Sequence, residues 1–173
     1  SHLRAEVHRD GKVHEQEYSR GKETYPVREF GTSDKNGTTV EFQPDEEIFE
    51  TLVYSYDTLA DRMRELAFLN QGLTITLTDQ RERVQDEEGN DLGYLNETFH
   101  STEGLKDFVS YLDSNREPLI SEVIHVSGER NGVPVEVAMT YNSSFAENLF
   151  SYVNNINTHE GGTHLTGFRR GLT

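Results

Sequence analysis

The sequence contains no cysteine, and this absence removes several kinds of site from consideration. A chain of 173 residues without a thiol forms no disulfide and no thiolate metal site. It also has no apolar run near the ~18 residues that a transmembrane helix needs. The first residues, Ser1 to Arg4, are not followed by the apolar segment of a signal peptide. We therefore expect a cytoplasmic protein with no membrane partner.

Basic residues are scarce. The chain has 16 Lys and Arg against 31 Asp and Glu, which gives a formal net charge of −15. Taken alone, this balance argues against a nucleic-acid partner, because phosphate contacts need clustered Lys and Arg. Lysine itself occurs only at positions 12, 22, 35 and 106. An acidic, lysine-poor surface is compatible with adaptation to salt and equally with an ordinary soluble acidic domain.

The first half of the chain combines strand and helix patterns. Residues 3–19 alternate around Gly11-Lys12, with a central Arg9-Asp10-Gly11 turn, and predict a β-hairpin. Residues 37–43 predict a strand after the Asn36-Gly37 turn. Apolar residues then recur with helical spacing between Ser55 or Asp57, as N-cap, and Gly72, as the stop. Residues 73–78 predict a further strand. The acidic stretch 86–91 fits a hairpin tip better than a calcium loop, since its ligands do not alternate.

The second half continues the mixture. Residues 101–113 predict a helix with Ser101 or Thr102 as cap, and residues 123–141 predict a hairpin around Asn131-Gly132. Residues 148–156 predict a strand, and a helix is expected after Gly161-Gly162. Antiparallel strands with helices between them indicate the α+β class.

Three candidate sites lie near the C-terminus. His159 and His164 are five residues apart, whereas a zincin helix places its histidines four apart, so we expect no zinc site. Gly161-Gly162-Thr163 fits an anion-binding helix start or a plain junction capped by Thr163. Arg169-Arg170 fits a phosphate contact or a solvated helix face. No nucleophile, base and orienting group can be placed together.

Six strings in order carry a specific resemblance. They are VHRDGK (7–12), NGTTVEF (36–42), RMRELAFLNQGL (62–73), GLKDFVSYL (104–112), GVPVEVAMTYN (132–142) and NNINTHEGGTHLTGFRRGLT (154–173). Their order and separations resemble the ATPase and transducer region of type IIA topoisomerases, and most closely the DNA gyrase B family. The resemblance spans nearly the whole chain.

The resemblance implies two partial domains and a fragment of a larger subunit. Residues 1–101 would be the C-terminal part of a GHKL-type ATP-binding domain, and residues 102–173 the first part of the transducer domain. The family's catalytic glutamate, its magnesium-binding asparagine and its ATP lid would lie before Ser1, and its Gln-Thr-Lys loop after Thr173. We therefore expect no catalytic residue and no metal ligand here, no tightly bound ATP or Mg²⁺, and no activity of the fragment alone.

Four family positions fall inside the chain. Thr38 resembles the threonine that hydrogen-bonds near the adenine of ATP, and Val40 an apolar wall of the same pocket. Arg9 resembles an arginine at the pocket mouth that binds aminocoumarin inhibitors. Arg169 resembles an arginine that lines the cavity through which double-stranded DNA passes. Arg170 falls where the family varies, and no role is carried onto it.

The resemblance also implies partners and activity. The full subunit would be an ATP-hydrolysing topoisomerase that couples ATP to DNA strand passage and negative supercoiling. It would dimerise with ATP and form a heterotetramer with the gyrase A subunit. A net negative charge is compatible with DNA if the DNA-facing surfaces are locally basic, since screening limits distant charges to ~8–10 Å. The ATPase subunit of topoisomerase IV and a non-catalytic scaffold with a transducer-like fold are the alternatives.

Overall fold

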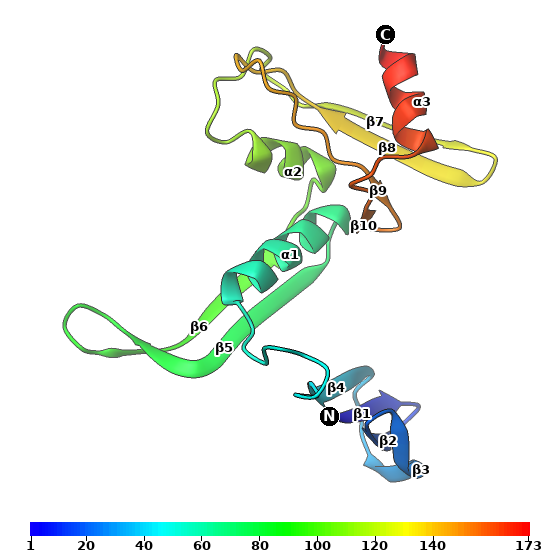
Figure 1. Cartoon of the computed structure of the whole chain (residues 1–173), viewed down its shortest axis with the longest axis vertical. Coiled ribbons are helices and arrows are strands. Elements are labelled where there is room, and N and C mark those ends of the chain that lie inside the picture. Colours follow the sequence, from blue (N-terminus) through cyan, green and yellow to red (C-terminus); the bar gives the residue numbers. More distant parts are fainter. The chain divides into compact units, whose positions relative to one another are not determined.

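The computed structural model describes all residues, 1–173, and divides them into two compact units, Ser1–Tyr54 and Ser55–Thr173 (Figure 1). Both strands and helices are present, so the α+β class is confirmed. The division at Tyr54 differs from the domain boundary expected near residue 101, which stays a prediction. None of the helices has the length and apolar character that crossing a membrane requires.

The first unit is built on a four-stranded antiparallel sheet in the order β3-β2-β1-β4. The strands are β1 (His2–Arg9), β2 (Lys12–Ser19), β3 (Lys22–Thr32) and β4 (Gly37–Gln43). The predicted hairpin and the predicted strand over 37–43 are confirmed. Asp10 and Gly11 have φ values of 53° and 79°, which is the backbone of a tight hairpin turn. Strand β3 was not predicted, because its sequence contains Pro26 and alternates poorly.

The second unit begins with α1 (Tyr56–Leu69), which packs on the hairpin of β5 (Thr74–Gln85) and β6 (Asp91–His100). Ser55 caps the helix as predicted, since its hydroxyl accepts from the backbone N–H of Thr58. Ala60 and Ala67 are buried against Phe99 and form the centre of the core. The acidic tip at 86–91 joins the two strands as predicted, but β5 extends beyond the expected residue 78.

Helix α2 (Leu105–Leu112) begins later than predicted and is not capped by a hydroxyl. The N-cap is Gly104, at φ 59°. The predicted cap Ser101 is buried and engaged elsewhere: its hydroxyl accepts from the N–H of Gly104 and donates to the Asp107 carboxylate. The hairpin of β7 (Ile124–Arg130) and β8 (Val133–Met139) turns at Asn131-Gly132 as predicted.

The C-terminal segment departs from prediction in two places. The strand expected over 148–156 is a small hairpin of β9 (Tyr152–Val153) and β10 (Ile156–Asn157), because Asn154 and Asn155 both take positive φ and reverse the chain. Helix α3 (Thr163–Leu172) follows the two glycines as expected, but its N-cap is Gly162 and Thr163 makes no cap bond. Arg169 lies in the last turn of α3.

Candidate functional site

Arg9, Thr38 and Val40 come together on one face of the four-stranded sheet. Thr38 on β4 is directly opposite Val7 on β1, and Val40 is opposite Ala5. Arg9 is two residues beyond Val7, and residues two apart on a strand share a face. The three residues that the family resemblance singled out therefore lie on one surface, although Arg9 and Thr38 are almost 30 positions apart in the sequence.

This face is open and chemically mixed. Val40 is 56% exposed, and the Arg9 side chain is 79% exposed with Nε 3.5 Å from the Asp10 carboxylate. The Thr38 hydroxyl can donate and accept hydrogen bonds, and the neighbouring Val40 offers apolar contact. A hydroxyl, an apolar side chain and an exposed cation on one face of the sheet are groups that can contact a planar ring with polar edges.

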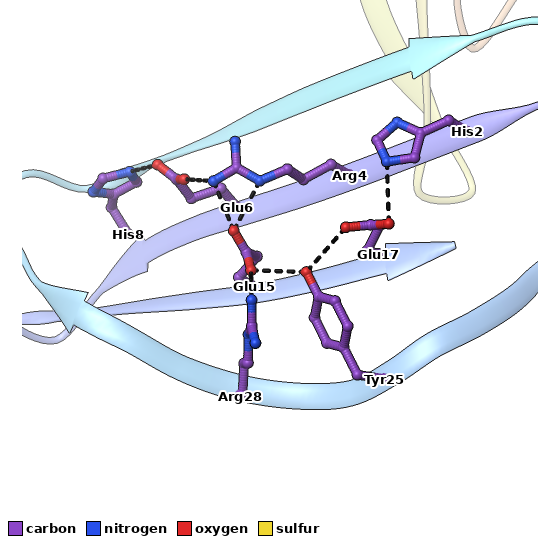
Figure 2. A network of polar contacts seen from close by, with 8 residues as sticks. All are labelled: His2, Arg4, Glu6, His8, Glu15, Glu17, Tyr25 and Arg28. Atoms are coloured by element: carbon purple, nitrogen blue, oxygen red, sulfur yellow. Dashed lines mark hydrogen bonds and ion pairs between the residues drawn. The ribbon is translucent and has the colours of Figure 1, made fainter. Parts of the chain in front are cut away.

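The opposite face of the same sheet carries a network of polar side chains centred on Glu15 (Figure 2). Glu15 is 4% exposed, yet it is an ionisable residue. Its carboxylate accepts from Arg28 Nη2 at 2.7 Å, from Tyr25 Oη at 2.8 Å and from Arg4 Nε at 2.8 Å. These hydrogen bonds, with that from Arg28 the strongest influence, lower the pKa of Glu15 to about 2.

The network extends along β1 and β2 (Figure 2). Arg4 also pairs with Glu6 at 2.7 Å, and Glu6 contacts His8 Nε2 at 2.7 Å. Tyr25 reaches Glu17 at 3.3 Å, and Glu17 lies 3.3 Å from His2 Nε2. Side chains from three strands are therefore linked on the face opposite Thr38 and Val40.

Reasoning from the sequence missed this network. A signal was present, because ionisable residues occupy every second position of β1 (His2, Arg4, Glu6 and His8), and Glu15 and Glu17 are two apart on β2. Its centre could not be identified, since two of the partners, Tyr25 and Arg28, lie on the strand that was not predicted. The network links side chains of β1, the strand that carries Arg9, to β2 and β3.

Arg169 lies in the second unit, on an exposed part of α3. Its Nη2 donates to the Glu147 carboxylate at 2.8 Å, and the two side chains are 56% and 67% exposed. Exposed ion pairs of this kind contribute only ~0–1 kcal/mol, so a phosphate could displace Glu147 at small cost. Arg170 is also exposed, whereas Phe168 is half-buried.

The chain gathers no group of three or more His, Asp or Glu side chains suited to a metal ion. His164 contacts the Thr158 hydroxyl at 3.0 Å.

Solved structures define the class of protein. The 43K ATPase domain of Thermus thermophilus gyrase B, solved with an aminocoumarin, matches 98% of the chain and 44% of its own length, with a TM-score of 0.81 and 32% identity. The gyrase B protein of Myxococcus xanthus shares the fold with a TM-score of 0.82, over 99% of the chain and 48% of its own length, at 22% identity. The fold is that of the GHKL-type ATPase region of type II topoisomerases.

Sequence relatives specify the family. A sequence model described as DNA gyrase B matches residues 104–173. The DNA gyrase B protein of Eisenibacter elegans is 54% identical over 171 residues, which are 99% of the chain and 35% of that relative. The DNA gyrase B protein of Halalkalibacterium halodurans is 49% identical over 172 residues, which are 99% of the chain and 25% of that relative. The chain is similar to DNA gyrase B proteins along nearly its whole length, and the resemblance stated from the sequence is confirmed. The chain therefore spans about a third of the length of the Eisenibacter elegans protein.

Proposed function

We propose that the chain is part of an ATP-dependent type IIA DNA topoisomerase, DNA gyrase, and that it links the nucleotide pocket to the DNA-handling part of the subunit. The observation that carries the proposal is the 54% identity to a gyrase B protein along 99% of the chain. The placement of Arg9, Thr38 and Val40 on one sheet face supports it, because the roles assigned to them require a common surface.

In this proposal the first unit forms one wall of the ATP pocket. Thr38 holds the nucleotide base through its hydroxyl, directly or through a water, and Val40 packs beside it. Arg9, at the end of β1, contacts inhibitors that extend beyond the base. Mg²⁺ and the hydrolytic machinery are supplied by other parts of the full subunit.

The second unit contributes the DNA contact. Arg169 exchanges its Glu147 partner for a phosphate of double-stranded DNA during strand passage. The full subunit works in the cytoplasm with the gyrase A subunit and dimerises when it binds ATP. Its action would introduce negative supercoils.

The test is ATP hydrolysis by the full subunit expressed from the gene that encodes this chain. We expect hydrolysis that requires Mg²⁺, is accelerated by linear DNA and is blocked by an aminocoumarin. The isolated 173-residue chain should show none of it. A full subunit that neither binds nor hydrolyses ATP would contradict the proposal and favour a scaffold role.

A further inference from the structure

The hairpin of β9 and β10 is held on the side of α1 by three polar contacts. Tyr152 Oη donates to the Glu65 carboxylate at 2.5 Å. Asn155 Nδ2 donates to Asn70 Oδ1 at 2.8 Å, and the carbonyl of Asn155 accepts from Arg62 Nη2 at 3.0 Å. The three partner residues, Arg62, Glu65 and the C-cap Asn70, are spread over the last turns of α1, so the hairpin is held along the helix and not at a single point.

The turn geometry makes this attachment specific. Asn154 and Asn155 have φ values of 50° and 64°, a conformation that asparagine tolerates better than most residues. This turn directs both the backbone carbonyl and the side-chain amide of Asn155 towards α1. The Asn154 side chain makes no hydrogen bond.

An apolar contact reinforces the polar ones. The Tyr152 ring lies 6.3 Å from that of Phe108 on α2, and Phe108 stacks on Phe68 of α1 at 5.2 Å. Burial and then the bond to Glu65 raise the pKa of Tyr152, so its hydroxyl stays protonated and donates at every physiological pH.

The same hairpin is joined to α3 on its other side. The Thr158 hydroxyl, just after β10, lies 2.6 Å from that of Ser151, just before β9. It also contacts His164 Nε2, in the first turn of α3, at 3.0 Å. Contacts therefore run without a gap from α1 through the hairpin to the helix that carries Arg169.

We propose that Tyr152 and Asn155 are positioning residues that couple α1 to α3, so that a nucleotide-driven movement of α1 changes the placement of Arg169. The inference rests on the proposed function and names the route by which DNA would regulate ATP hydrolysis. Neither residue touches ATP or DNA in this account. Both act by holding the hairpin to Glu65, Arg62 and Asn70.

The experiment uses the full subunit with three substitutions. Tyr152→Phe removes only the hydroxyl and keeps the ring on Phe108. Asn155→Gly removes the amide and allows the positive φ, and Asn154→Gly makes the same change one residue earlier, where no side-chain bond is lost. ATP hydrolysis is measured with and without linear DNA, together with the melting temperature.

We expect Tyr152→Phe and Asn155→Gly to lower the DNA-stimulated rate about threefold or more, with the DNA-free rate unchanged within about twofold. Asn154→Gly should keep both rates. The proposal is overturned if DNA stimulation survives in both variants, if Asn154→Gly abolishes it equally, or if both rates fall in proportion to a lowered melting temperature. Absence of DNA-stimulated hydrolysis in the unaltered subunit would instead refute the proposed function itself.

Discussion

At the scale of single residues, Thr38 is the sharpest test of the proposed nucleotide-facing surface. Thr38→Val retains the β-branched shape and removes the hydroxyl. If that hydroxyl holds the base, the full subunit should lose about 1–3 kcal/mol of ATP affinity, because a polar partner is left unpaired. The melting temperature without nucleotide should barely move, since the side chain is exposed.

Thr39→Val is the matched control for this measurement, because it makes the same change on the opposite face of β4. Titration calorimetry with a non-hydrolysable ATP analogue compares the two variants. Equal affinities in both would remove Thr38 from the site.

Arg9 should matter for inhibitor binding more than for turnover. Arg9→Ala should weaken aminocoumarin inhibition by about 1.5–3 kcal/mol, the contribution of a hydrogen bond to a charged group. Its side chain is 79% exposed at the end of β1, so its loss should not disturb the sheet. Inhibition curves of the full subunit check this against Lys22→Ala, a cation at the other end of the sheet. Collapse of ATP turnover with unchanged inhibitor potency would contradict the assignment.

Glu15 makes the first unit sensitive to acid. Its pKa of about 2 in the folded state lies below the ~4.3 of an unfolded glutamate. The carboxylate therefore stabilises the fold above pH ~5, and this contribution is lost as the pH falls towards 2.

Glu15→Gln should lower stability at neutral pH and flatten the acid dependence between pH ~5 and ~2. Urea unfolding at several pH values measures both effects. Glu46→Gln, at an exposed position outside the network, should retain the slope of the unaltered protein. A full acid slope in Glu15→Gln would show that other carboxylates are responsible.

At the scale of elements, α3 is where DNA should be sensed. Arg169→Ala should reduce DNA-stimulated ATP hydrolysis and leave the DNA-free rate nearly intact, because the side chain is exposed and held only by Glu147. One lost phosphate contact should also reduce the log–log salt dependence of DNA affinity by about 0.9. Arg170→Ala, its exposed neighbour, is the control. Equal loss of both rates would mark Arg169 as structural.

Sequence patterns predicted the elements whose signals are local. The α1 helix was predictable from its 3.6-residue spacing and the Ser55 cap, and two hairpins from turns at Asp10-Gly11 and Asn131-Gly132. The start of α2 was not, because the expected cap Ser101 bonds to Asp107, a competing partner that only the fold reveals.

The candidate site was predictable only in part, because some of its contacts join segments that are distant in the sequence. Family resemblance supplied Arg9, Thr38, Val40 and Arg169, but periodicity alone gave none of them a role. The Glu15 network and the bond of Tyr152 to Glu65 depend on pairings between distant segments. Tertiary packing fixes such pairings, and local patterns in the sequence do not show them.

At the scale of the whole molecule, the net charge of −15 must be reconciled with the proposed DNA partner. Much of the basic charge is internally paired: Arg4 and Arg28 bind Glu15, and Arg64 binds Glu97. Adjacent arginines occur only in α3, at Arg169 and Arg170. Because screening confines each charge to ~8–10 Å, Arg169 can meet a phosphate although the chain as a whole is acidic.

The most direct test of the account is a supercoiling assay with the full subunit and its gyrase A partner on relaxed plasmid DNA. The account predicts negative supercoils that appear only with ATP and Mg²⁺ and are suppressed by an aminocoumarin. ATP-dependent relaxation or decatenation without supercoiling would point to topoisomerase IV and contradict the gyrase assignment. No ATP-dependent change in DNA topology would contradict the proposed function as a whole.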